Sequence, residues 1–161
     1  MTIGAPREDP GPGPDARSDG EGDADATHGM HPAYFTTRFR IRDPIEDWPQ
    51  EFVIISAYAT TGETWTDEEN ERADQELEAA LTKLGVWTHP VLGFSTESDH
   101  AEPSRAARLS IDEARELGRR FRQLAIFHVR GDQLSVTGCE EGAALVRVGR
   151  FRERLHPGPA W

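Results

Sequence analysis

The sequence has a single cysteine and no long apolar run. Cys139 is the only thiol among the 161 residues, so no internal disulfide can form. No window approaches the roughly 20 consecutive apolar residues that a membrane-spanning helix needs. A secretory signal has a basic start followed by an apolar stretch, and residues 1–9 do not have this pattern. We therefore expect a cytoplasmic protein without a membrane span.

An excess of positive charge is also absent. The chain has 18 lysines and arginines against 29 acidic residues, a net charge of −11. Nucleic acids and anionic lipids are bound through clustered cations, so neither is expected as a partner. No metal or cofactor is expected, because His89, His100, His128 and Cys139 lack the paired spacing of zinc ligands.

Composition divides the chain into a tail and a body. Residues 1–31 hold six glycines, four prolines and seven acidic residues, with almost no large apolar side chains. Such a segment buries too little surface to offset its ordering entropy, which predicts disorder. The length suits one domain. We predict a disordered tail over 1–31, a single α+β domain over 32–155 and a flexible end over 156–161.

Hydrophobic periodicity orders the body into strands and two helices. The uninterrupted run at 52–58 is typical of a central strand covered on both faces. Thr66 with Glu69, and Ser110 with Glu113, form capping boxes that start two helices. Further strands are predicted at 34–41, 86–93, 105–109, 124–129, 133–136 and 144–151. Pro90 places the 86–93 strand at a sheet edge.

The order of these elements predicts the fold class. From residue 52 to residue 129 it is strand, helix, strand, strand, helix, strand. That order matches a ferredoxin-like βαββαβ core, an α+β fold with a mixed or antiparallel sheet and two helices on one face. Extra strands at both termini would extend the sheet. A three-layer α/β arrangement is the alternative.

Two positions on the predicted helices have both a structural and a functional interpretation. Asn70 shares a helical stripe with Ala73 and Leu77, so it faces inward. It either ties the 59–65 loop to the sheet or lines a pocket beside Tyr58. Arg119 lies on a face with interleaved acids, which favours surface ion pairs, and an anion site is the alternative.

Several separated segments together resemble a known family. They are FVIISAY at 52–58, Glu69-Asn70 with Arg72 and Leu77, Gly93, Glu102-Pro103-Ser104, and the stretch 114–127 that contains Gly118, Arg119 and Gln123. This series resembles the bacterial domain of unknown function 3293 family over about residues 50–137.

The resemblance implies a recurrent polar set and no activity. That set comprises Tyr58, Asn70, Glu102, Ser104 and Gln123. In the family an Asn-Pro pair usually follows the Ala-Tyr pair, whereas this chain has Ala59-Thr60. Arg122 stands where a small residue is common.

Three functions follow as hypotheses. The first is a non-catalytic binding or regulatory domain whose cleft, formed by the polar set, holds a small polar ligand or a peptide. The second is an enzyme acting on a phosphorylated or nucleotide-like molecule, with Glu102 as acid or base and Arg119 or Arg120 as anion clamp. The third is a protein-interaction module, a homodimer by default, that uses an open sheet edge at 34–41 or the arginine-rich stretch at 147–154.

Overall fold

The computed structural model describes residues 30–60 and 63–157 of the chain. The prediction of a disordered tail therefore falls mostly outside the described residues. The elements are η1 (Pro32–Phe35), β1 (Arg38–Ile41), β2 (Glu51–Ser56), α1 (Asp67–Leu84), β3 (Thr88–Phe94), β4 (Ala101–Ala107), α2 (Ile111–Arg120), β5 (Ala125–Arg130), β6 (Gln133–Gly138), β7 (Leu145–Arg150), α3 (Phe151–Arg154) and β8 (Leu155–Pro157).

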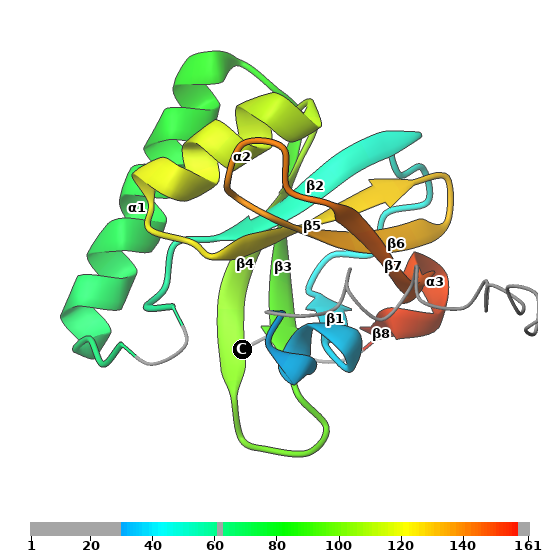
Figure 1. Ribbon diagram of the computed structural model, residues 1–161, viewed down its shortest axis with the longest axis horizontal. Coiled ribbons are helices and arrows are strands. Elements are labelled where there is room, and N and C mark those ends of the chain that lie inside the picture. The colour runs from blue at the N-terminus through cyan, green and yellow to red at the C-terminus, as the bar shows by residue number, and fades with distance from the viewer. Residues whose placement is uncertain (1–29, 61–62, 158–161) are drawn as a thin grey trace, which may run out of the picture.

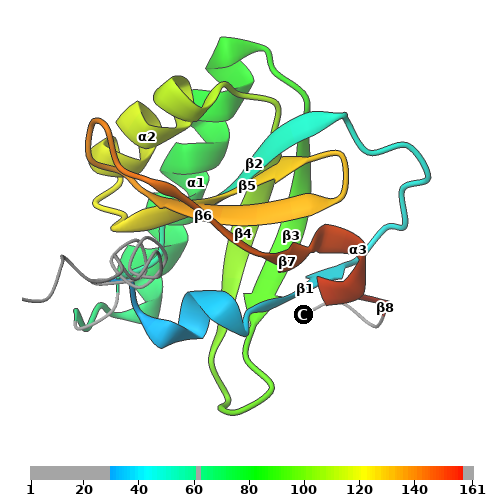
Figure 2. The ribbon, with the colours of Figure 1, turned by 45° about the vertical axis from the view of Figure 1, so that its right-hand side comes forward.

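One sheet of eight strands dominates the described chain. The strand order is β7-β6-β5-β2-β4-β3-β1-β8, and neighbours are antiparallel except for the parallel pair of β1 and β8. The sheet curls into a half-barrel (Figures 1 and 2), with α1 and α2 on its convex face. Its concave face is buried by the curl itself and by the segments at both ends of the chain.

The predicted ferredoxin-like fold is wrong, and the structure does not adopt the three-layer alternative. The structure is a sheet-dominated α+β fold, with a mixed half-barrel and a third helix, α3. The physical reason lies in the terminal segments. They do not simply widen a flat sheet: β1 and β8 extend it beyond β3, β6 and β7 extend it beyond β5, and the whole sheet bends round an apolar interior.

Strand β2 lies at the centre, as its apolar run predicts. It pairs with β4 on one side and β5 on the other. Val53 and Ile55 pack under the helices, while Phe52 and Ile54 belong to the concave cluster. All four are at most 2% exposed. A strand with apolar side chains in every position needs cover on both faces, and the helices and the curl supply it.

Aromatic rings fill much of the concave face. Phe52 lies between Trp48 and Phe151, with ring centroids 5.1 and 5.3 Å away. Phe39 packs edge-on against Phe127 at 5.2 Å. These rings come from strands and loops far apart in sequence, so they hold the curled sheet together through bulky, complementary contacts.

Three predictions about the sheet edges need correction. Residues 34–41 are not one edge strand: Pro32–Phe35 form a 3₁₀ helix, and β1 is paired with both β3 and β8. Residues 156 and 157, the start of the segment expected to be flexible, belong to β8 (Leu155–Pro157). Strand β3 is internal, yet β1 pairs only with its residues 92–94, so Pro90 needs no hydrogen bond on that side.

Both predicted capping boxes are present. The Thr66 and Ser110 hydroxyls accept from the amides of Glu69 and Glu113, whose carboxylates accept from the cap amides. Helix α1 ends at Gly85 in the left-handed conformation, as predicted. None of the described helices is both long enough and apolar enough to cross a membrane.

The contact between α2 and the segment after β6 is unusually close. A Cβ built on Gly118 would lie 2.5 Å from the Cys139 sulfur. Gly118 is therefore required for helix packing and not for backbone freedom.

We expect Gly118→Ala to destabilise the protein by about 1–3 kcal/mol, because the added methyl group overpacks this contact. In a Cys139→Ala background the same change should be neutral or stabilising, since Ala favours a helix over Gly by about 1 kcal/mol. Urea unfolding of the four proteins measures both effects. An equal cost of Gly118→Ala in both backgrounds would contradict the contact.

Candidate functional site

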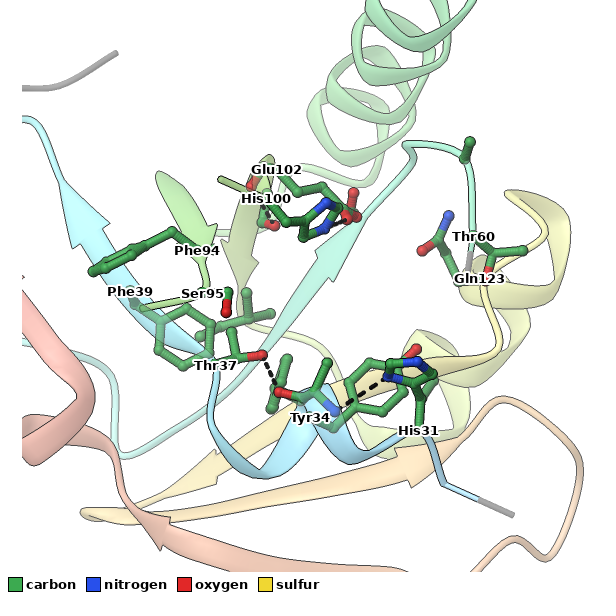
Figure 3. Close-up of a pocket in the computed structure, with 18 of the residues that line it drawn as sticks. His31, Tyr34, Thr37, Phe39, Thr60, Phe94, Ser95, His100, Glu102 and Gln123 are labelled. Atoms are coloured by element: carbon green, nitrogen blue, oxygen red, sulfur yellow. Dashed lines mark hydrogen bonds and ion pairs between the residues drawn. The ribbon is translucent and has the colours of Figure 1, made fainter. Parts of the chain in front are cut away.

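A cavity of about 440 Å³ opens on the concave face (Figure 3). It lies at the Ser56 end of β2, whereas Trp48 packs against Phe52 near the other end of that strand. Its walls come from η1 and β1, from the last residues of β2 and β3, and from the first residues of β4 and β5. These strand ends meet at one edge because the strands are antiparallel.

The cavity lies where the side chains of the concave face change from apolar to polar toward this edge. Residues two apart on a strand share a face. On β4 the concave face therefore passes from Ala106 through Ser104 to Glu102, and on β2 it passes from Ile54 to Ser56. Gly93 of β3 pairs with Glu102 and adds no side chain to the wall.

Glu102 is the central polar group of this cavity. Its side chain is 22% exposed, and its Oε2 lies 3.2 Å from Nε2 of His100, whose own side chain is 68% exposed. Figure 3 shows both residues on one side of the cavity, with Tyr34 and His31 opposite. The second oxygen of Glu102 has no hydrogen bond to a described residue, so it can receive one from a ligand.

Tyr34 closes the opposite wall. Its ring packs edge-on against Phe127, with centroids 5.8 Å apart. Burial raises the pKa of its phenol above the usual value, and the charge of Glu102 raises it further. The hydroxyl is therefore protonated at neutral pH and has a proton to donate into the cavity.

The two serines in the floor are already engaged. The Ser104 hydroxyl donates to the carbonyl of Glu102, and the Ser56 hydroxyl donates to the carbonyl of Pro103. Ser56 also accepts from the amide of Tyr58 at 3.1 Å. These bonds fix the start of the loop after β2, which forms part of the rim.

Gln123 links that loop to β5. Its side-chain nitrogen donates to the carbonyl of Tyr58 at 2.8 Å and to that of Phe121 at 3.2 Å. Its side-chain oxygen has no partner among the described residues, and the residue lines the cavity.

The structure places the predicted site residues in different surroundings. Glu102, Ser104 and Gln123 line the cavity together. Tyr58 and Asn70 hold its rim, because the carbonyl of Tyr58 receives Gln123 while Oδ1 of Asn70 accepts from the amide of Ala59 at 2.8 Å.

The Tyr58 ring and Arg119 belong elsewhere. The ring lines a second cleft of about 480 Å³ on the other side of Ser104, with Asp67, Glu71 and Asp74. Arg119 lines a third hollow, where its guanidinium donates to the carbonyl of Cys139. The structure therefore does not bring Arg119 and Glu102 to one cavity.

Sequence reasoning missed the wall formed by η1. His31 and Tyr34 fell in segments read as tail and strand. A local signal was present, because His31 precedes a proline and caps the 3₁₀ helix by accepting from the amide of Ala33 at 3.1 Å. Long-range packing of η1 against β5 had no such signal.

Comparison with known proteins identifies the segment that carries the resemblance. The model of the family described as "Protein of unknown function (DUF3293)" matches residues 55–126. The resemblance to the DUF3293 family is confirmed. No curated protein and no solved structure matches the chain.

The DUF3293 match contains much of the cavity but not all of it. It runs from the end of β2 to the start of β5, and so includes Glu102, Ser104 and Gln123. Residues 31–39, which close the cavity, precede it. Ala59 and Thr60, where the family usually has Asn-Pro, line the rim.

Arg122, the other departure from the DUF3293 pattern, has a conformational explanation. It follows α2 with a φ of 57°, the one positive value at a non-glycine position among the described residues. The amide of Gln123 reaches back to the carbonyl of Gly118 at 2.8 Å. A left-handed residue after a helix is usually glycine, so a small residue would adopt this conformation more readily than Arg122 does.

Asn70→Ala tests the rim. Losing the acceptor for the Ala59 amide should cost about 1 kcal/mol of stability, the lower end of the range for an unpaired polar group, because Ala59 is half-buried. Asn70→Asp keeps an acceptor oxygen and should cost clearly less. Thermal unfolding compares them, and an equal loss in both variants would show that this hydrogen bond does not hold the loop.

Proposed function

We propose that this protein is a ligand-binding domain that holds a small polar molecule in the concave cavity without transforming it. The observation that carries the proposal is the convergence of Glu102, Ser104 and Gln123 from separate elements on one cavity. A volume of about 440 Å³ lies within the usual range of small-molecule sites.

The make-up of the walls supports binding. Phe39, Phe94 and Phe127 supply apolar surface, while an oxygen of Glu102 and one of Gln123 are unpaired. A mainly apolar cavity with a few oriented polar groups is the common design of ligand sites, because burial gives affinity and the polar groups give specificity.

The hydrogen bonding opposes covalent catalysis. Ser56 and Ser104 donate to backbone carbonyls, so no base accepts either proton. Cys139 is buried among the residues under the helices, and burial raises the pKa of its thiol to about 11, which keeps it protonated at neutral pH. These groups lack the activation that a nucleophile needs.

The alternative, an enzyme acting on a phosphorylated or nucleotide-like molecule, receives less support. Its required acid or base, Glu102, does line the cavity beside His100. However, no lysine or arginine is among the described residues of the lining, whereas phosphate recognition ordinarily uses such cations.

Gly93→Leu provides the test. A Cβ on Gly93 meets its neighbours at ordinary distances of 3.7–3.8 Å and the backbone is unstrained, so the larger side chain can project into the cavity. Thr88→Leu, an exposed position on the same strand, is the matched control. The three proteins are screened by thermal shift against amino acids, amines, sugars and nucleosides.

We expect at least one compound to raise the melting temperature of the wild type and of Thr88→Leu but not of Gly93→Leu. Saturation at about 100 times the dissociation constant adds roughly 2.7 kcal/mol, which is several degrees for a domain of this size. No hit at all, or hits that persist in a folded Gly93→Leu protein, would reject the proposal.

A further inference from the structure

The charges of the cavity walls are of one sign. Glu63 and Glu102 are the acidic residues of the described lining, and His31 and His100 are the only side chains there that can become cationic. The whole chain carries −11. In a cavity with apolar walls such carboxylates create a negative potential, which attracts cations and repels anions.

Two largely buried carboxylates have an ion pair in the described chain, Asp74 and Glu102, and their cationic partners differ. Asp74, with 17% of its side chain exposed, has Arg105 at 2.8 Å. Glu102, with 22% exposed, has only the exposed imidazole of His100. A carboxylate withdrawn from water is costly without a cation close by, so Glu102 has the environment of a group that a ligand completes.

Aromatic rings line the same cavity as this carboxylate. Tyr34 and Phe39 each pack edge-to-face against Phe127, and Phe94, whose ring already has the guanidinium of Arg40 4.6 Å from its centroid, follows Gly93 at the rim. Ring faces attract organic cations and also bury hydrocarbon groups. The combination of one unpaired carboxylate oxygen with several rings suits a molecule that has a cationic end and an apolar body.

We propose that the cavity binds an organic cation, a protonated amine or quaternary ammonium on a small apolar body, with Glu102 as its counter-ion. This rests on the proposed function and specifies its ligand class. The charge of the amine meets the unpaired oxygen of Glu102, the hydrocarbon part lies against Phe127 and Tyr34, and the oxygen of Gln123 accepts a further hydrogen bond from the ligand.

The second cleft is a weaker candidate for the same ligand. It is lined by more acids, Asp67, Glu71 and Asp74 among them, but Arg105 already neutralises Asp74 and Arg42 lies in the same lining. Its aromatic contribution is Tyr58, with none of the phenylalanines. Carboxylates that are already paired gain less from an added cation.

Matched probes test the inference. Phenethylamine, tryptamine, cadaverine and choline are titrated by calorimetry into the full chain, together with 3-phenylpropionate and 2-phenylethanol, which share the body of phenethylamine without its positive charge. Glu102→Gln removes the charge at constant shape. Glu97→Gln, on the exposed hairpin between β3 and β4, is the matched control.

We expect at least one amine to bind the wild type and Glu97→Gln with equal affinity. Glu102→Gln should weaken it by about tenfold or more, the effect of losing roughly 1.4 kcal/mol of ion pairing. The anion and the alcohol should bind at least about tenfold more weakly than the amine. Melting temperatures verify that both variants are folded.

Three outcomes overturn the inference: no amine binds the wild type, Glu102→Gln binds the amine as well as the wild type does, or the anion binds more tightly than the amine. Failure of the proposed ligand class, an organic cation, can be distinguished from failure of the proposed ligand-binding function. A neutral or anionic compound that binds the wild type but not Gly93→Leu would refute the cationic ligand and leave the cavity as a binding site.

Discussion

Burial of strand β2 on both faces is the constraint on which the rest of the structure depends. Val53 and Ile55 require the two helices, while Phe52 and Ile54 require cover on the opposite side. Among the described residues no layer of long helices covers that side, and the curl of the sheet together with β1, β8 and α3 buries those side chains. The cavity is the part of the concave face where that cover is incomplete.

The polar residues in and around the cavity have two different roles. Asn70, Ser56 and Gln123 hold the loop after β2 through backbone hydrogen bonds, which sets the rim. Glu102 faces into the space and keeps an oxygen free. These residues therefore have two kinds of role, because some position the wall and others can contact a ligand.

Local signals in the sequence predict the elements better than their arrangement. The capping boxes at Thr66 and Ser110 and the central strand depend on neighbouring residues, and all three are confirmed. The ferredoxin-like fold failed because pairing of β1 with β8 joins residues more than 100 positions apart, which periodicity does not encode. Glu102, Ser104 and Gln123 were found through the family resemblance, whereas the wall formed by Tyr34 depends on long-range packing.

The central claim is that the concave cavity, and not the acidic cleft of similar volume on the other side of Ser104, is the binding site. Titration of ¹⁵N-labelled protein with the tightest-binding probe, followed by amide chemical shifts, tests it most directly. The account predicts the largest shifts at Thr37, Gly93 and Phe127, with little change at Glu71 and Asp74. Shifts concentrated at Glu71 and Asp74 would contradict it.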